Sequence, residues 1–425
     1  MVIRPFTALH ASADAPRAAV LSLSDIASDP RVRRQCRALS EAGWRVTSVA
    51  FGHGERADPW RHRSVPALPF DARLLRRAAR VAGLLATRLT PAIAFTVWRA
   101  QPRHQALLRA CRDLSADLVI ANDYTSLPAA LDLVAGTSAA LVYDAHEFSV
   151  GERAENPVWR LLYPPFVAAI EGAGLSAAQG CCAVSDGIAR LMQARHNLPR
   201  RPTVVRNVPT FRSVPAHPTG ERLLVHHHGA LAPERGIELM IRSVPLWEPR
   251  FSLRIVGPAE EAYRRRLHGM IAELGIGDRA RLEPAVPPDR MIPVAAEADI
   301  GLMLTVGGTP QLDHSLPNKL FEYVMAGLAL VVTDLPDAAG LVRARDLGRV
   351  LPAPTPEALA GVINGLDREA VAEYRRRALE AARDLCWEAE SAVFLDLCTA
   401  ALASRKGGAA AIRPPALREP ALGGS

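Results

Sequence analysis

This chain of 425 residues has no apolar run long enough to cross a membrane. A transmembrane helix needs about 20 consecutive apolar residues, and a typical uncharged apolar run here, residues 89–98, is only ten. The N-terminal segment also lacks the apolar centre of a signal peptide. We therefore expect a cytoplasmic protein without membrane spans.

Paired metal ligands are also missing. The chain has no D-x-D motif, no C-x-x-C pair and no cysteine with a histidine at metal-binding spacing. We therefore expect no metal and no other cofactor. The cysteines are scattered, as is usual for reduced thiols buried in an intracellular protein; they are Cys36, Cys111, Cys181, Cys182, Cys386 and Cys398.

Lysine is nearly absent. Of 51 basic residues only Lys319 and Lys406 are lysine, and Lys406 lies in a C-terminal segment that is poor in core-forming residues. A lone lysine in the folded part of an arginine-rich chain suggests a specific role. The net charge of +7 and the pI of about 9.4 favour anionic partners, which include acidic lipid, phosphorylated small molecules and nucleic acid. The chain lacks a basic module with interleaved aromatic residues, so we expect no nucleic-acid partner.

Short runs of Val, Ile and Leu alternate with helical patterns along the whole chain, which indicates parallel sheets covered by helices on both faces. The first half predicts strands at residues 18–24, 45–51, 117–122, 140–144, 180–184 and 203–205. The second half predicts strands at residues 223–228, 252–256, 281–286, 299–304 and 329–333.

The length suits two domains of about 200 residues each. We expect one domain over residues 1–212, a Pro-rich linker over 213–221 and a second domain over 222–385. A terminal helix over 386–404 and a disordered tail over 405–425 complete the chain. The expected fold is α/β, with two Rossmann-like doubly wound domains that face a cleft and bind ligands at the carboxyl ends of their strands.

The segment SLPNKLFEYVMAGLALVVTD is the most informative one. Pro317 suits a first helical turn and Gly327 a helix end, while Lys319 and Glu322 share one helix face. They could form a surface ion pair worth a few tenths of a kcal/mol. Lys before Glu is the weaker order, however, and a cation in the first turn opposes the helix dipole. A phosphate at this helix start is the other interpretation, which the sequence leaves open.

A second segment, LLVHHHGALAPER, predicts a strand, a loop with Gly229 and a helix that starts near Arg235. Gly229 would let the backbone approach a phosphate closely. The consecutive His226, His227 and His228 look like metal ligands, but side chains alternate between the faces of a strand. We therefore expect no metal there.

These segments, with LRIVGP and EADIGLML, are similar to the C-terminal domain of family-four retaining glycosyltransferases of the GT-B fold. DPRVRRQCRALSEAGWRVT, ADLVIANDYTSLPAA, LVYDAHEF and GCCAVSDGIARLM resemble the N-terminal domain of the same family, so the resemblance covers roughly residues 18–400. It implies a hexosyl-type, metal-independent transferase of polysaccharide biosynthesis. The donor would be a nucleotide-sugar bound by the C-terminal domain, and the acceptor a glycan or lipid-linked glycan bound by the N-terminal one.

The resemblance also implies roles for the donor-binding residues. Glu322 matches the glutamate that binds the ribose hydroxyls of the donor. Arg235 sits where the family has a cation on the diphosphate, and Lys319 is placed to assist it. Gly229 falls in the loop beneath the phosphates, and Asn318 belongs to the same motif as Lys319.

Val286 and Pro287 match the backbone segment that holds the nucleobase edge. His146 resembles the family's histidine that approaches the transferred sugar. Two positions depart from the family: His314 stands where it has its first glutamate, and Ala230 where it commonly has an arginine. Because of them, a catalytically silent nucleotide-sugar-binding protein stays open, as does a nucleotide-sugar epimerase of the same fold.

Residues 71–89 predict an amphipathic helix. Its arginines are Arg73, Arg76, Arg77, Arg80 and Arg88, and its apolar side chains are Leu74, Ala78, Val81, Leu85 and Leu89. Such a helix can lie in the headgroup region of an anionic membrane, which would make the protein peripheral at the inner face of the plasma membrane. A helix packed on a domain core has the same pattern, and the sequence does not decide between the two.

Overall fold

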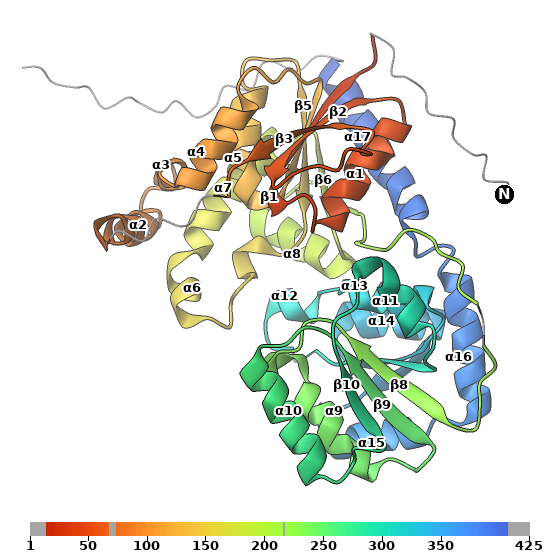
Figure 1. Cartoon of the computed structure of the whole chain (residues 1–425). Coiled ribbons are helices and arrows are strands. Elements are labelled where there is room, and N and C mark those ends of the chain that lie inside the picture. The colour runs from red at the N-terminus through yellow and green to blue at the C-terminus, as the bar shows by residue number, and fades with distance from the viewer. Residues whose placement is uncertain (1–13, 68–73, 216, 306, 407–425) are drawn as a thin grey trace, which may run out of the picture. The chain divides into compact units, whose positions relative to one another are not determined.

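The computed structural model describes residues 14–67, 74–215, 217–305 and 307–406 (Figure 1). These residues divide into two compact units. The first unit contains residues up to 184, residues 188–205 and the chain from 391 on, and the second contains residues 185–187 and 206–390.

The first unit is built on a seven-stranded parallel sheet with the order β3-β2-β1-β4-β5-β6-β7. Its strands are β1 (Arg17–Asp25), β2 (Arg45–Phe51), β3 (Arg61–Val65), β4 (Leu118–Asn122), β5 (Ala140–Ala145), β6 (Gly180–Ala183) and β7 (Thr203–Val204). Its α-helices are α1 (Pro30–Glu41), α2 (Leu74–Ala86), α3 (Ile93–Arg99), α4 (Pro102–Cys111), α5 (Asp123–Val134), α6 (Pro157–Leu162), α7 (Pro164–Ala177), α8 (Asp186–His196) and most of α17 (Trp387–Lys406).

The second unit has a six-stranded parallel sheet with the order β10-β9-β8-β11-β12-β13. Its strands are β8 (Leu223–His228), β9 (Phe251–Val256), β10 (Ala280–Glu283), β11 (Ile300–Met303), β12 (Ala329–Thr333) and β13 (Gly348–Leu351). Its α-helices are α9 (Ile237–Ser243), α10 (Glu261–Glu273), α11 (Pro288–Ala295), α12 (Pro310–Asp313), α13 (Asn318–Met325), α14 (Pro336–Arg345), α15 (Pro356–Asn364) and α16 (Arg368–Ala381).

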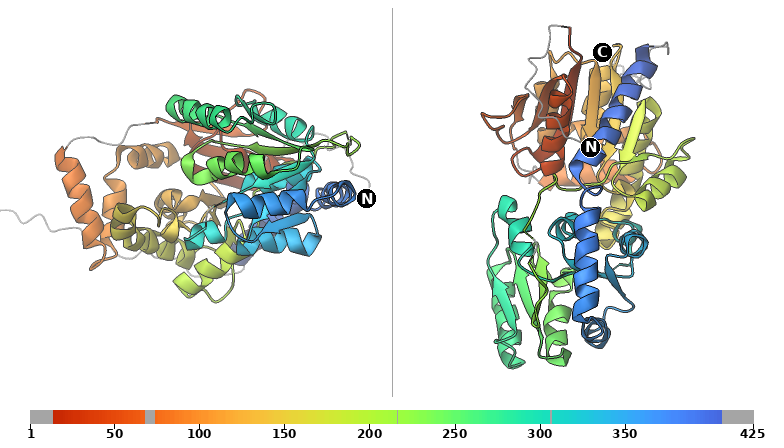
Figure 2. Two further views of the ribbon diagram at one scale, coloured as in Figure 1. Left: turned by 90° about the horizontal axis from the view of Figure 1, so that it is seen from below. Right: turned by 90° about the vertical axis from the view of Figure 1, so that its right-hand side faces the viewer.

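Helices cover both faces of each sheet, so the predicted α/β fold with two doubly wound parallel sheets is confirmed (Figure 2). The central strands β4 and β5 are buried along their whole length because both faces are covered. Two strands were not predicted. β3 and β13 are sheet edges with mostly polar or partly exposed residues, so they lack the apolar run that marks a central strand.

The strand predicted at residues 281–286 is wrong at its end. β10 stops at Glu283 because Pro284 has no N–H to donate to a neighbouring strand. The terminal helix α17 runs on to Lys406, two residues into the predicted tail, and residues 407–425 of that tail lie outside the described residues.

In both units the strand order reverses near the centre of the sheet, between β1 and β4 in the first and between β8 and β11 in the second. In doubly wound sheets ligands bind at the carboxyl ends of the strands beside such a reversal. This topology directs attention to the carboxyl edges around β1 and β4 in the first unit and around β8 and β11 in the second.

Among the described residues, no helix is long and apolar enough to span a membrane. All six cysteines carry free thiols; five are buried and Cys181 is partly exposed.

Candidate functional site

The loop after β8 requires glycine. Gly229 has a φ of +124°, which L side chains rarely adopt. A Cβ atom on Gly257, the residue after β9, would lie 1.9 Å from the carbonyl oxygen of Gly229. The two loops therefore meet backbone to backbone at the strand-order reversal, and they leave the face of Gly229 open to another group.

Lys319 occupies that face. A Cβ atom on Gly229 would meet the Lys319 Nζ at 3.3 Å. Burial and the nearby Arg235 lower the pKa of Lys319 to about 8, and Glu322 offsets only part of this effect. Two cations thus lie close enough to repel each other above a glycine loop, and an anion placed between them would relieve both the repulsion and the desolvation.

The predicted helix starts need two corrections. Arg235 ends a short 3₁₀ helix (Pro233–Arg235), and α9 begins only at Ile237 because Gly236 takes a left-handed φ of +72°. α13 begins at Asn318, and Pro317 stands at the N-cap position just before the first turn, without a side-chain capping bond. Asn318 is exposed at this helix start, where backbone N–H groups have no partner within the helix.

Glu322 is held by histidine rather than by Lys319. Its Oε2 accepts a hydrogen bond of 2.7 Å from the Nε2 of His228. The Nδ1 of His228 lies 3.1 Å from the Nε2 of His226, whose Nδ1 lies 3.3 Å from the Nε of Arg254. An arginine can only donate, so each imidazole accepts at Nδ1 and donates from Nε2. Arg254, His226, His228 and Glu322 therefore form one chain of hydrogen bonds that orients the carboxylate.

The same contacts account for the triple histidine. Burial lowers the pKa of His226 to about 2, with help from His228 and Arg254, so His226 is neutral in this chain of bonds. His227 points to the other face of β8, where its Nδ1 bonds the carbonyl of Leu302 at 2.9 Å. In the described part of the chain, no group of three or more His, Cys, Asp or Glu side chains could hold a metal ion.

The remaining predicted residues of this unit lie around the same sheet. Val286 and Pro287 are in the loop between β10 and α11, at the carboxyl edge that Gly229 and Gly257 share. Ala230 is exposed beside Gly229. His314 follows α12, and its Nδ1 lies 3.4 Å from a carboxylate oxygen of Asp337.

The first unit holds His146 directly after β5, at the carboxyl edge of its own sheet. One ring nitrogen, Nε2, lies 3.0 Å from Asn122 Oδ1 and 3.2 Å from Asp144 Oδ2, and Nδ1 lies 3.3 Å from Asp123 Oδ2. Burial opposes the charge of the ring, but Asp123 and Asp144 outweigh it and raise the pKa of His146 to about 9. His146 is therefore an imidazolium at neutral pH, with both ring nitrogens facing acceptors.

Asp144 is fully buried beneath this ring. The Nε and Nη2 of Arg31 each donate to it at 2.7 Å, the thiol of Cys182 lies 3.1 Å away, and Gln35 donates a further bond. Burial alone would raise the pKa of Asp144, but Arg31 and His146 lower it far below the usual range. Asp144 thus stays ionised inside the unit and holds the charge of His146 in place.

The exposed side of His146, 19% of its side chain, faces a cavity of about 550 Å³. Aromatic and acidic side chains line this cavity. Burial and the neighbouring Glu152 and Asp123 raise the pKa of Glu147 to about 7, so Glu147 is about half protonated at neutral pH. A cavity with these groups can accept hydrogen bonds from hydroxyl groups and stack on flat or apolar faces; its lining includes Asp123, Tyr124, Glu147, Glu152, Trp159 and Tyr163.

Sequence reasoning missed Arg31, Asp144 and Arg254. Arg31 is 113 positions from Asp144, and Arg254 is 28 positions from His226, so no local pattern pairs them. The one available signal was the order Asp144, Ala145, His146 at a strand end, which places Asp144 and His146 on the same face.

Known proteins agree with this architecture. The family described as "Glycosyl transferase 4-like domain" matches residues 28–208, and "Glycosyl transferases group 1" matches residues 222–367. No curated protein sequence matches the chain. Because the two matches cover well over half of the chain, one in each unit, this protein belongs to the glycosyltransferases of the GT-B fold.

Solved structures show the same fold at low sequence identity. Sucrose-phosphate synthase from Thermosynechococcus elongatus is 17% identical, with a TM-score of 0.70 over 92% of this chain and 100% of that one. HepE from Anabaena, solved with UDP and glucose, is 15% identical, with a TM-score of 0.66 over 90% and 99%. WaaG, a glycosyltransferase involved in lipopolysaccharide biosynthesis, is 14% identical, with a TM-score of 0.62 over 90% and 99%.

Proposed function

We propose that this GT-B enzyme transfers a hexosyl group from a nucleotide-sugar to a glycan or a lipid-linked acceptor, with retention of anomeric configuration. The observation that carries the proposal is Lys319, lying over Gly229 with Arg235 near enough to lower its pKa. This pair of neighbouring cations suits a diphosphate. The structure of HepE with UDP-glucose, a protein of the same fold, supports a uridine nucleotide as the first donor to test.

The donor residues then have distinct roles. Lys319 and Arg235 neutralise the diphosphate, whose negative charge grows as the glycosyl–phosphate bond breaks. Gly229 and the start of α13 at Asn318 offer backbone N–H groups to it. Glu322, oriented by His228, accepts from the ribose hydroxyls.

Val286 and Pro287 hold the nucleobase edge through their backbone. His146 is proposed to act on the transferred sugar. Because its pKa is raised to about 9, it would act as a fixed cation rather than as a general base at neutral pH.

We further propose that no metal takes part, because the two fixed cations supply the charge that a divalent ion would supply. Transfer should therefore persist in excess EDTA. Activity that disappears with the chelator and returns with magnesium or manganese would overturn this part of the proposal.

The central experiment is a thermal-shift screen with UDP, GDP and ADP, because a bound nucleotide raises the unfolding temperature by mass action. A nucleotide that stabilises the parent but not a Lys319→Ala variant would support the donor site. If none of the three stabilises the parent, the donor assignment is wrong.

Two alternatives are separated by product analysis with the sugar form of the bound nucleotide. An epimerase would convert the sugar without any acceptor, and a silent binding protein would leave it unchanged. The second alternative stays open because His314 and Ala230 differ from the residues that the family has at these positions. WaaG, with its part in lipopolysaccharide biosynthesis, supports trying lipid-linked acceptors, which would bring the enzyme to a membrane surface as a peripheral protein.

A further inference from the structure

The apolar stripe of α2 faces outward. Helix α2 packs by its other side, where Leu84 is buried and a Cβ atom on Gly83 would lie 2.6 Å from the side chain of Val97 on α3. The stripe itself is exposed and continues into the turn after the helix; its side chains are Val81 (40% exposed), Leu85 (43%) and Leu89 (90%). This amphipathic helix therefore does not use the exposed part of its apolar stripe to cover the core.

Helix α6 adds to the same surface. It buries Trp159 and Leu162 against the first unit but exposes Val158 by 64% and Leu161 by 57%. A guanidinium nitrogen of Arg88, just after α2, donates to the carbonyl of Leu161 and joins the two segments. We call the exposed apolar side chains the α2–α6 surface; they are five of the nine large exposed hydrophobics among the described residues, namely Val81, Leu85, Leu89, Val158 and Leu161.

Positive charge borders the α2 part of this surface. From residue 72 to residue 112 the chain carries nine arginines and no Asp or Glu. Arg77 and Arg88 are exposed at the border of the stripe, and Arg160 is exposed on α6. Arg73 lies outside the described residues. An apolar surface bordered by arginines fits a partner that is apolar inside and negatively charged at its boundary.

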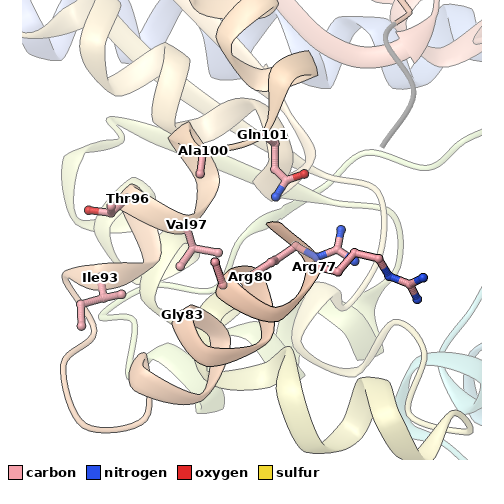
Figure 3. A pocket seen from close by; sticks show the side chains of 9 residues that line it. Arg77, Arg80, Gly83, Ile93, Thr96, Val97, Ala100 and Gln101 are labelled. Atoms are coloured by element: carbon pink, nitrogen blue, oxygen red, sulfur yellow. The ribbon is translucent and has the colours of Figure 1, made fainter. Parts of the chain in front are cut away.

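A groove on the packed side of α2 also combines arginine and apolar side chains. It has a volume of about 360 Å³ and lies between α2 and α3 (Figure 3). The side chains of Arg77 and Arg80 extend toward one end of it, near Gln101, and Ile93 lies at the other end, with Val97 between them. A cationic end and an apolar end match the two parts of an anionic lipid, whereas a groove for a soluble anion would need no apolar end.

We propose that the α2–α6 surface docks on an anionic lipid bilayer, with the apolar side chains in the interface and the arginines among the headgroups. An extended apolar stripe with cations along its border is the pattern of helices that lie in the membrane plane. The inference rests on the proposed function only in that a lipid-linked acceptor would require the enzyme to reach a membrane. Binding to lipid can be measured without donor or acceptor, so it tests the surface by itself.

The experiment is sedimentation of the full chain with vesicles of phosphatidylcholine, alone or with about 30% phosphatidylglycerol. The parent should pellet with the anionic vesicles at low salt, pellet less with rising salt and stay in solution with neutral ones. A triple variant, Leu85→Gln, Leu89→Gln and Leu161→Gln, should bind at least about tenfold more weakly because it removes the apolar contacts. A second variant, Arg77→Gln with Arg160→Gln, should lose several-fold and show a smaller salt dependence.

Matched controls remove the same groups elsewhere. Leu274→Gln replaces an apolar side chain that is 40% exposed in the second unit, and Arg265→Gln removes an exposed charge on α10. Both should bind like the parent. Nucleotide-induced thermal shifts should be equal in all variants, so a failure of lipid binding is distinct from a failure of the donor site.

Two results would overturn the proposal. If the parent stays in solution with anionic vesicles at low salt, the surface is not a membrane-docking surface. If the parent forms a dimer on size-exclusion chromatography that the triple variant loses, the surface belongs to a second copy of the chain.

Discussion

The two units share one strand order around the reversal of their sheets, but they treat charge at the carboxyl edge in different ways. In the first unit the cation His146 lies among Asn122, Asp123 and Asp144, and Arg31 balances Asp144 in turn. In the second unit Lys319 lies near another cation, and its pKa is lowered.

The two edges differ in whether their charged side chains find opposite charges within the protein. Charges that are paired within the protein stabilise it and hold a side chain in a fixed state. Two cations that repel each other are stabilised when an anionic ligand binds between them. The favourable electrostatic energy therefore appears on binding rather than on folding. The same scaffold can therefore carry one edge that is complete and one that is completed by an anion.

The largest expected effect is on stability, at the carboxyl edge of the first unit, where the charges are paired. Arg31→Ala should lower the free energy of unfolding by about 3–5 kcal/mol, because it leaves the buried Asp144 without its main partner. Chemical denaturation of the full chain measures this loss. Arg343→Ala is the control, since it removes an exposed ion pair with Asp334 and should change the free energy of unfolding far less. Equal losses would show that the first edge does not depend on charge pairing.

The pH dependence of stability is the second expectation. The folded pKa of His146, about 9, lies above its ordinary value of 6.5, so the stabilisation is fully present below pH 6.5 and is lost as the pH rises through 9. At about 1.4 kcal/mol per pKa unit, the loss is about 3 kcal/mol. The difference in unfolding free energy between the parent and His146→Gln should shrink by this amount from pH 6.5 to pH 9.5. Parallel pH curves for the two proteins would contradict it.

At the carboxyl edge of the second unit, substitutions should change ligand affinity. Lys319→Ala and Glu322→Ala should each weaken UDP binding by about 1.5–3 kcal/mol, roughly ten- to a hundredfold, because each removes a charged hydrogen bond. Both variants should still unfold cooperatively, which chemical denaturation of each variant checks. Calorimetric titration measures the affinity, and Arg265→Ala serves as the exposed-charge control. Unchanged UDP affinity in both variants would refute the donor site.

The smallest expected effect concerns the orientation of Glu322. His228→Phe keeps an aromatic ring but cannot donate to Glu322, and the backbone N–H of His228 still reaches the Tyr323 hydroxyl at 3.0 Å. We expect UDP affinity to fall by about 0.5–1.5 kcal/mol. His228→Gln, which restores an N–H donor, should recover part of it. A loss in His228→Phe as large as that of Glu322→Ala would mean that the ring itself contacts the ligand.

The sequence predicts the elements whose signals are local. The apolar runs give the central strands, and the segments around Gly229 and Lys319 give a strand-loop-helix pattern, because these features depend on neighbouring residues. The bonds from Arg254 to His226 and from Arg31 to Asp144 join separate elements and have no local signature. The outward face of α2 was also beyond the sequence, because a periodic pattern shows that a helix has an apolar stripe but not which side packs.

Helix α17 gives the chain an unusual order of completion. Its residues from 391 on belong to the first unit, where Phe394 and Cys398 are fully buried and a guanidinium nitrogen of Arg405 donates to the carbonyl of Thr137 at 3.1 Å. The ribosome makes the other strands and helices of that unit first but these residues after the whole second unit. During synthesis the first unit therefore keeps an apolar face uncovered until residues 391 onward are made. The second unit, contiguous from residue 206 to residue 390, can finish folding before it.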